Sequence, residues 1–372
     1  MPQIPQTDPR ANYLAHKAKI DIAIQRVLES GWYILGKEVE TFEQAFAAYI
    51  GVSHAIGVAS GTDALELALR ACGVGPGDLV FTVSHTAVAT IVAIELVGAT
   101  PVLVDIDPMT YTLDPNCLEE ALVYPPTGRP KAVIPVHLYG QPADMVAILE
   151  LAHRYGLYVI EDCAQSHGAT LEGRMTGAWS DIAAFSFYPT KNLAALGDGG
   201  MVVTPNTKLA EHTRSLRQYG WRRRYISEIP GCNSRLDELQ AAILRVKLEY
   251  LEAENARRNA LAARYTTVLT DSGLTLPVCR ENARHVYHQY VVRSPHRDAL
   301  QGYLRSQGIG TLVHYPMAIH QQPAYKGRIP ITGALPHSER SSAEVLSLPI
   351  YPELTDEQVD FVAEACHNWG QS

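Results

Sequence analysis

The 372-residue sequence has few cysteines, few clustered positive charges and no long apolar run. Its six cysteines are scattered without any CxxC pair, which argues against a disulfide framework and against a thiolate metal site. Lysine and arginine total 31 against 39 aspartates and glutamates, a net charge of −8, and the one basic run is Arg222–Arg224. Because nucleic acid is bound through clustered lysine and arginine, it is excluded as the main partner.

The apolar stretches are too interrupted to cross a membrane. The longest, around 87–104, contains Glu95 and Gly98 and falls short of the roughly 18 uninterrupted apolar residues of a membrane span. The N-terminal MPQIPQTDPR lacks the apolar core of a secretory signal, so we expect a cytoplasmic protein. The length suffices for two domains with sizeable cores.

Short β-branched runs alternate with helix-length segments between about residues 55 and 205. The runs are DLVFTV, TPVLVDID, KAVIPVHL, LYVIED, IAAFSF and GGMVVT. Helices are expected to begin near Thr62, Thr86, Asp114, Asp144 and Asn206, which are residue types that favour helix N-termini. This alternation predicts an α/β domain with a largely parallel sheet covered on both faces.

A long helical segment follows this domain. From Leu236 the sequence LDELQAAILRVKLEYLEAENARRNALAARYTTVL has apolar residues at helical spacing and no proline. We expect this long helix to join a large α/β domain, residues 1–245, to a smaller α+β domain, residues 246–372. The smaller domain would contain a strand at HQYVVR, a loop rich in His, Tyr and Pro, and a terminal helix.

Three short segments carry candidate chemistry. The segment SGTDALELALR opens a helix whose first N–H groups suit a phosphate, the alternative being an ordinary cap at Ser60. LYVIEDCAQSHGA places Asp162 at the end of a strand, where α/β sheets bind ligands, although a loop carboxylate can also cap a turn there. In SFYPTK, partial burial would lower the pKa of Lys191 and free an amine nucleophile, whereas most lysines are simply solvated.

Taken together, the three segments match the needs of pyridoxal 5′-phosphate. A lysine holds the aldehyde as an imine, an aspartate keeps the pyridine nitrogen protonated, and helix N–H groups anchor the phosphate. The sequence lacks GxGxxG and GxxxxGK[ST], which weighs against a nicotinamide-dependent dehydrogenase and a P-loop site. His314 and His320 could suggest a metal pair, but no carboxylate or thiolate cluster is near them in sequence, and no metal is expected.

The segments SGTDAL, EDCAQSHGA, SFYPTKNLAALGDGG, GCNSRLDELQAAIL, HYP and LPHSER…LSLPIYP occur in this order. With them the sequence resembles the nucleotide-sugar aminotransferases of the DegT/DnrJ/StrS type over nearly the whole chain. The resemblance implies the fold type I, aspartate aminotransferase-like architecture, with a mostly parallel seven-stranded sheet in the large domain. It also implies pyridoxal 5′-phosphate as cofactor and a homodimer with shared active sites.

The resemblance also assigns cofactor-binding roles to particular residues. Lys191 becomes the imine-forming, catalytic lysine, Asp162 the partner of the pyridinium nitrogen, and Gln165 a neighbour of the phenolic oxygen. The phosphate ligands implied are Gly61, Thr62, Ser186 and, from the neighbouring subunit, Asn233. Many relatives have an aromatic residue that stacks on the pyridine ring where this sequence has Ala87, and the nearby His85 is the candidate substitute.

Substrate contacts and subtype follow from the same comparison of segments. The residues implied around the sugar and diphosphate are Tyr188, Arg224, His314 and Tyr315. FYPTKNLAALGDGG, YGWRRRYIS and NSRLDELQAAILRVKL most resemble aminotransferases acting at carbon 3 of a dTDP-linked 3-keto-6-deoxyhexose, giving a dTDP-3-amino-3,6-dideoxyhexose. The expected amino donor is L-glutamate. A guanidinium such as that of Arg224 suits a diphosphate, although a solvated surface run is the alternative.

Three other functions stay open at this point: an aminotransferase for a 4-keto nucleotide sugar, a PLP-dependent sugar dehydratase, and a non-catalytic sensory protein that binds the cofactor. Relatives of the dehydratase type carry histidine where this sequence has Lys191. The complete set of Lys191, Asp162 and Ser186 disfavours the sensory protein.

Overall fold

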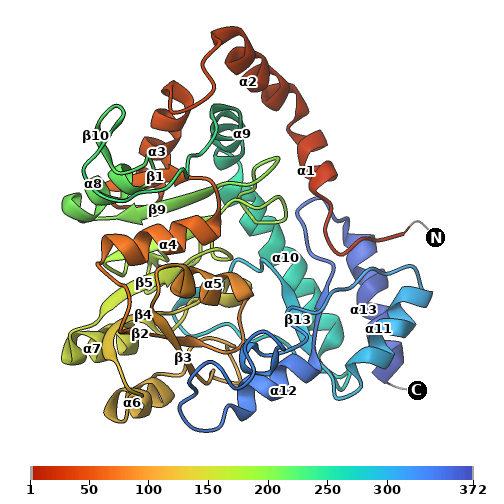
Figure 1. Cartoon of the computed structure of the whole chain (residues 1–372). Coiled ribbons are helices and arrows are strands. Elements are labelled where there is room, and N and C mark those ends of the chain that lie inside the picture. The colour runs from red at the N-terminus through yellow and green to blue at the C-terminus, as the bar shows by residue number, and fades with distance from the viewer. Residues whose placement is uncertain (1–2, 371–372) are drawn as a thin grey trace.

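The structure, a computed structural model, describes residues 3–370 and has a seven-stranded sheet at its centre (Figure 1). In spatial order the strands are β1 (His54–Val58), β9 (Gly200–Thr204), β8 (Ile182–Ser186), β5 (Tyr158–Asp162), β4 (Arg129–Ile134), β2 (Asp78–Val83) and β3 (Thr100–Val104). Strand β9 is antiparallel to both of its neighbours, and the other pairs are parallel. The predicted mostly parallel sheet is confirmed, and each of the six apolar runs overlaps one strand.

Helices cover both faces of the sheet because its strands bury side chains on both sides. In β2, Leu79 and Phe81 belong to one buried cluster and Val80 to another. The first face carries α6 (Pro115–Val123), α7 (Met145–Tyr155) and, over β1 and β9, α3 (Lys37–Ile50). The second carries α4 (Gly61–Ala71), α5 (Val88–Leu96) and α8 (Thr207–Leu216).

Side-chain oxygens cap the first turns of these helices. Asp114, Asp144 and Asn206 accept hydrogen bonds from N–H groups at the starts of α6, α7 and α8, as the sequence predicts. Helix α5 begins at Val88 with Ala87 as its N-cap, two residues after the expected start at Thr86.

The long helix expected after Leu236 is two consecutive helices, α9 (Glu238–Leu248) and α10 (Leu251–Leu269). The amides of Glu249 and Tyr250 donate to carbonyls three residues earlier, so the last turn of α9 tightens and its regular ladder ends. Helix α9 packs on α2 and α3, whereas α10 packs on α13. The domain division at residues 245 and 246 stays a prediction; it falls within α9, whereas the packing partner changes at the break between α9 and α10.

A separate core lies in the C-terminal part of the chain. Its elements are α10, β13 (Tyr290–Arg293), α11 (Arg297–Ser306), β14 (Val345–Leu348) and α13 (Asp356–Gly370), which gather at the right of Figure 1. Their buried side chains include Leu261, Tyr265 and Leu346, and Ile4 from the N-terminal segment joins them. Strands β13 and β14 are antiparallel, which agrees with the expected α+β character.

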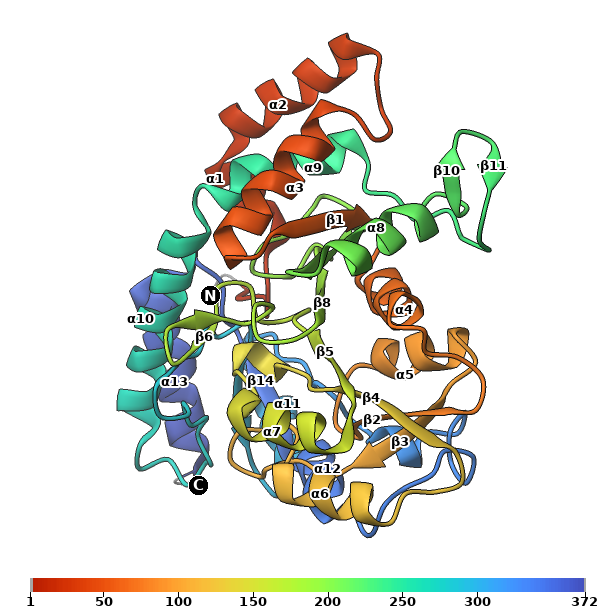
Figure 2. The same cartoon turned by 90° about the vertical axis from the view of Figure 1, so that its left-hand side faces the viewer.

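The remaining elements lie around these two cores. They are α1 (Pro9–Ala15), α2 (Lys17–Ser30), η1 (Leu138–Gly140), β6 (Thr170–Leu171), β7 (Arg174–Met175), β10 (Trp221–Arg223), β11 (Ile226–Ser227), β12 (Ala283–Arg284), η2 (Ile319–Gln321) and α12 (Pro336–Glu344). The β10–β11 hairpin projects from the body at the upper right of Figure 2. Within residues 3–370, no helix has both the length and the apolar character needed to span a membrane.

Candidate active site

A cavity of about 230 Å³ lies where β5 and β8 end and α4 begins. Its lining brings together seven of the residues singled out from the sequence: Gly61, Thr62, Asp162, Gln165, Ser186, Tyr188 and Lys191. They come from separate stretches of the chain, so the fold creates this grouping. Ala87 also lines the cavity, at the place where the resemblance would put an aromatic ring.

The start of α4 forms one wall of the cavity and is shaped by close backbone approach. A Cβ atom built on Gly61 would lie 2.5 Å from the Cβ atom of Ser186, and one on Gly200 would lie 2.1 Å from the carbonyl oxygen of Ser60. Glycine is therefore required at both positions. Ser60 caps the helix by accepting from the Asp63 amide at 3.1 Å. The partial positive charge at this helix end suits a phosphate placed beside Gly61 and Thr62.

The Asp162 carboxylate is buried at the end of β5 and forms another part of the cavity wall. It accepts hydrogen bonds from Thr90 Oγ1 at 2.9 Å and from the Ala164 amide at 3.1 Å. Burial raises its pKa against the effect of these bonds and of the positive charge on Lys191. A buried carboxylate of this kind gains from a cationic partner such as a pyridinium N–H.

Lys191 lines the same cavity from the turn after β8. Burial lowers the pKa of its ammonium to about 8, although the negative charge of Asp162 opposes this shift. A larger fraction of neutral amine is therefore present near neutral pH than for an ordinary lysine. The side chain can act as a nucleophile toward an aldehyde and as a proton acceptor.

Gln165 connects the cavity to two tyrosines. Its Oε1 accepts from the Tyr139 amide at 2.7 Å, and its Nε2 donates to the Tyr315 hydroxyl at 3.1 Å. Burial raises the pKa of Tyr315 to about 12, so the hydroxyl stays protonated. His314 and Tyr315 do not line the cavity, but this bond brings Tyr315 to its edge.

His314 and His320, the two histidines considered as a metal pair, contact different partners. The His314 ring pairs with Ser347 Oγ at 2.8 Å, whereas His320 pairs with Ser84 Oγ at 2.7 Å and Glu339 at 3.0 Å. Burial, assisted by the positive charge of Lys191, lowers the pKa of His314 to about 4. The ring of His314 is therefore neutral at neutral pH.

His85 occupies a position that differs from the expectation. Its ring is fully buried and outside the cavity lining, 2.8 Å from the Tyr139 hydroxyl and 3.1 Å from Ser342 Oγ. Ala87 lines the cavity while His85 turns into the core, so the ring is not placed for stacking on a cofactor. Burial lowers its pKa to about 4, which keeps it neutral.

Arg224 and Asn233 lie away from the cavity of their own chain. Arg224 is exposed at the β10–β11 hairpin, with its guanidinium 5.0 Å from the centre of the Tyr225 ring. Asn233 is exposed in the segment that leads to α9. Tyr188 lines the cavity and is 53% exposed, so part of its ring faces solvent.

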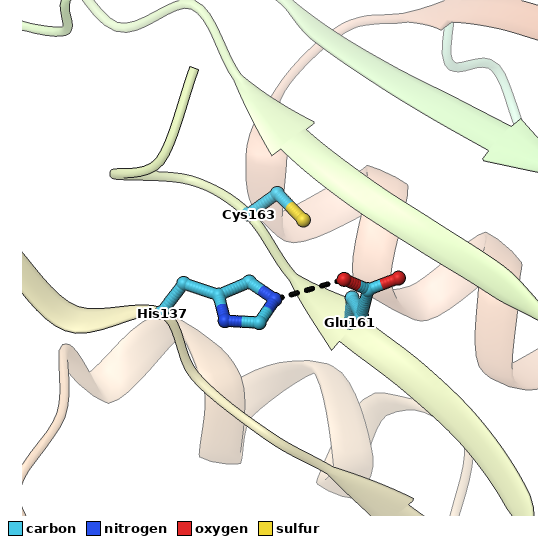
Figure 3. A group of neighbouring side chains, drawn as sticks. All are labelled: His137, Glu161 and Cys163. Atoms are coloured by element: carbon cyan, nitrogen blue, oxygen red, sulfur yellow. Dashed lines mark hydrogen bonds and ion pairs between the residues drawn. The ribbon is translucent and has the colours of Figure 1, made fainter. Parts of the chain in front are cut away.

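The residues on either side of Asp162 in the sequence form a cluster with His137. The potential ligand atoms of His137, Glu161 and Cys163 are within 4.8 Å of one another (Figure 3). The Ala143 amide donates to His137 Nδ1 at 3.0 Å, so His137 Nε2 carries the hydrogen and donates to Glu161 at 2.9 Å. With both ring nitrogens engaged in this way, His137 has no lone pair to offer a metal ion.

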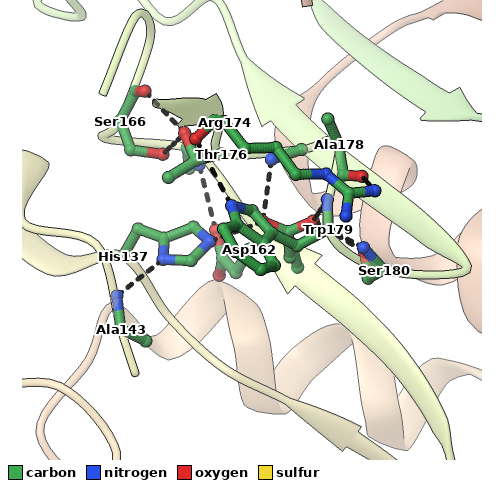
Figure 4. A network of polar contacts seen from close by, with 12 residues as sticks. His137, Ala143, Asp162, Ser166, Arg174, Thr176, Ala178, Trp179 and Ser180 are labelled. Carbon is green, nitrogen blue, oxygen red and sulfur yellow. Dashed lines mark hydrogen bonds and ion pairs between the residues drawn. The ribbon is translucent and has the colours of Figure 1, made fainter. Parts of the chain in front are cut away.

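Glu161 itself is saturated with donors, and three of its partners, His137, Trp179 and Ser180, are labelled in the polar network of Figure 4. Besides His137, it accepts from the amides of Gly177, Trp179 and Ser180 and from the Ser180 hydroxyl, at 2.8–3.1 Å. Burial alone would raise the pKa of Glu161, but these bonds outweigh it and hold the pKa below its ordinary value. The cluster therefore has a structural role. In addition, the His137 amide donates a hydrogen bond to the Asp162 carbonyl oxygen at 3.1 Å.

Sequence reasoning missed several residues that support this site. The Thr90 hydroxyl donates to Asp162, which lies 72 positions away in the sequence, so no local pattern indicates the bond. Tyr139 and His137 carry no local signal either. Their partners are distant in the sequence, so only the fold reveals them.

Comparisons with known proteins agree with this geometry. The sequence model of the DegT/DnrJ/EryC1/StrS aminotransferase family matches residues 15–367. The chain is 50% identical over 371 residues to a dTDP-3-amino-3,4,6-trideoxy-alpha-D-glucose transaminase of Streptomyces venezuelae, covering 100% of this chain and 97% of the relative. It is 48% identical over 367 residues to a dTDP-3-amino-3,6-dideoxy-alpha-D-galactopyranose transaminase of Aneurinibacillus thermoaerophilus, covering 99% of each.

A crystal structure of S. venezuelae DesV in complex with a ketimine intermediate has a TM-score of 0.97 and 50% identity, over 100% of both chains. This likeness confirms the expected fold type I architecture. Aminotransferases of the matched family depend on pyridoxal phosphate. The family match over most of the sequence and the two curated relatives agree with one another, and the chain belongs to the DegT/DnrJ/EryC1/StrS aminotransferase family.

Proposed function

We propose that the chain uses pyridoxal 5′-phosphate to transfer an amino group from L-glutamate to a dTDP-linked 3-keto-6-deoxyhexose, giving a dTDP-3-amino-3,6-dideoxyhexose. The observation that carries the proposal is the cavity that joins Lys191, Asp162 and the start of α4. These three would bind, in turn, the aldehyde, the pyridine nitrogen and the phosphate of the cofactor. The two transaminase relatives, whose names specify 3-amino sugars linked to dTDP, support carbon 3 as the site of amination.

The residues present fit the cofactor. The close packing of Gly61 on Ser186 leaves N–H groups and a hydroxyl at the helix end for the phosphate. The Asp162 carboxylate, held by Thr90 and Ala164, would bind the pyridine nitrogen in its protonated form. When bound, the cofactor supplies an electron-accepting ring that stabilises negative charge on the neighbouring substrate carbon.

The protein supplies the proton transfer. Because burial lowers the pKa of Lys191 to about 8, its neutral amine can take a proton from the carbon that bears the amino group. Asp162 would keep the proton on the ring nitrogen of the bound cofactor, since a carboxylate paired with a cation is better stabilised than one buried alone. Gln165 and Tyr315 offer a hydrogen-bond donor and a hydroxyl at the cavity edge.

We also propose a homodimer with shared sites. Asn233 and Arg224 lie outside the cavity of their own chain, and both are exposed, so a second subunit could use them. Asn233 would complete the phosphate site of the neighbouring subunit. Arg224, with Tyr188, His314 and Tyr315, would surround the sugar and diphosphate, for which a guanidinium is the matching donor.

The test of the reaction uses two half-reactions. The protein is loaded with pyridoxal 5′-phosphate and mixed with L-glutamate, and loss of the cofactor absorbance band with formation of 2-oxoglutarate is expected. A panel of 3-keto and 4-keto dTDP-sugars is then added, and the products are identified by mass and NMR. An amine at carbon 3 supports the proposal, whereas an amine only at carbon 4 contradicts the subtype.

The shared site is tested by mixing two inactive variants. Lys191→Ala and Asn233→Ala dimers are mixed, dissociated and reassembled. A hybrid dimer then contains one site with both wild-type residues, so activity should return. If each subunit builds its own site, the mixture stays as inactive as its parents.

A further inference from the structure

Tyr139 is fully buried in η1, the turn between β4 and α7, and it has an unusual backbone. Its φ of 60° lies in the left-handed region, which a tyrosine adopts only when its surroundings impose it. The turn places the residue between the cofactor cavity and the C-terminal core.

Each polar group of Tyr139 contacts a different segment. Its amide donates to Gln165 Oε1 at 2.7 Å, and its carbonyl accepts from the Gln289 amide, next to β13, at 3.2 Å. Its hydroxyl contacts the His314 carbonyl oxygen and, at 2.8 Å, His85 Nε2. One residue thus joins the cavity, the strand pair of the C-terminal core and the loop that carries Tyr315.

The hydrogen atoms in this network can be assigned. A hydroxyl has one hydrogen, and the His314 carbonyl can only accept, so the Tyr139 hydroxyl donates to it. His85 Nε2 must then donate to Tyr139, and His85 Nδ1 accepts from the Ser342 hydroxyl. His85 therefore orients the hydroxyl of Tyr139 rather than a cofactor ring.

We infer that Tyr139, oriented by His85, is a positioning residue that holds Gln165 and the His314–Tyr315 loop in place at the cavity. The inference rests on the proposed function for its effect on catalysis. Its structural part stands on the contacts alone. Without the Tyr139 hydroxyl, the His314–Tyr315 loop loses a hydrogen bond, while the Tyr139 amide still donates to Gln165.

The structural part is tested by hydrogen exchange on the protein without cofactor. Tyr139→Phe should speed the exchange of amides in residues 312–318 by about tenfold, the equivalent of one lost hydrogen bond. Tyr111→Phe is the matched control, because Tyr111 is buried in the same aromatic cluster, with its ring centre 5.5 Å from that of Tyr139. Equal exchange in the two variants would overturn the inference.

The catalytic part is tested by kinetics and by rescue. Tyr139→Phe should raise KM for the nucleotide sugar about tenfold with a smaller change in kcat, since a displaced loop weakens binding. His85→Leu should reproduce both effects, whereas His85→Gln keeps an N–H donor near the Nε2 position and should restore them. A His85→Gln variant as impaired as His85→Leu would refute the orienting role.

The two hypotheses fail in different ways. If the wild-type protein forms no absorbance band with pyridoxal 5′-phosphate, the proposed function fails, and the exchange comparison still decides the role of Tyr139. If the wild type binds the cofactor and turns over while the Tyr139→Phe variant matches wild type in exchange and KM, the inference fails alone.

Discussion

Glu161 and Asp162 are consecutive carboxylates at the end of β5, and their surroundings are opposite. Glu161 faces the side of the sheet occupied by α7 and accepts five hydrogen bonds. Asp162 faces the cavity and accepts two. The pKa of Glu161 is held below its ordinary value, whereas burial raises that of Asp162.

The different surroundings of the two carboxylates give one residue of the strand a structural role and the next a chemical role. Because successive side chains of a strand point to opposite faces, one residue can be satisfied by the protein while its neighbour keeps capacity for a ligand. The hydrogen bonds that Glu161 accepts from the protein satisfy its carboxylate without any ligand. Asp162 is a buried carboxylate with two hydrogen bonds and the nearby charge of Lys191, and it keeps capacity for a cationic ligand.

The largest expected effect is on the cavity side. Replacing Lys191 by alanine removes the amine that holds the cofactor and moves the proton, so turnover should fall by roughly 10⁴-fold or more. The absorbance band of the bound cofactor should disappear, while the melting temperature of the protein without cofactor stays near that of wild type. A coloured, active Lys191→Ala protein would contradict the assignment.

Asp162→Asn tests the second cavity group. An amide cannot hold the ring nitrogen in its protonated form, so turnover should fall by about 10² to 10⁴-fold. The stability of the cofactor-free protein should not fall, because a buried carboxylate with a raised pKa is replaced by a neutral group of the same shape. The measurements are steady-state kinetics and chemical denaturation. Strong destabilisation by Asp162→Asn would show that Asp162, like Glu161, is a structural residue.

Glu161→Gln should show the reverse pattern. Removing a buried charge that accepts five hydrogen bonds should cost about 3 kcal/mol of unfolding free energy, while the cofactor band persists. The folded-state pKa is depressed, so the stabilisation is present above the ordinary pKa of 4.5 and is lost as pH falls through the folded value. The difference between wild type and variant should therefore shrink on acidification. A difference that is constant with pH would exclude the ionised form.

Much of the fold could be predicted from local pattern. The six apolar runs specify six of the seven strands of the sheet, all except β1, and Asp114, Asp144 and Asn206 mark helix starts, because both signals depend on neighbours in the sequence. The break between α9 and α10 carries no proline or glycine, so the pattern predicted one helix there. It arises where α9 leaves its packing against α3 and α10 meets α13.

The residues of the site also fall into those that the local sequence pattern predicts and those that it does not. Lys191 and Asp162 could be found because each follows an apolar strand, and a strand end is where such sheets bind ligands. The position of His85 was not predictable, since its partners Tyr139 and Ser342 are distant in the chain. The proposed roles of Arg224 and Asn233 depend on a second subunit, which one chain does not contain.

The smallest expected effect is the pH dependence of cofactor capture. With a Lys191 pKa of about 8, the neutral amine increases about tenfold from pH 6 to pH 7, and the rate of band formation should rise with it. The rate should level off near pH 8, and an α-N-acetylated lysine measured in parallel corrects for ionisation of the cofactor itself. Asp162→Asn removes the charge that raises the Lys191 pKa, so its plateau should begin at lower pH, whereas Glu161→Gln should leave the plateau in place. A wild-type rate still rising at pH 10 would show an ordinary, solvated lysine.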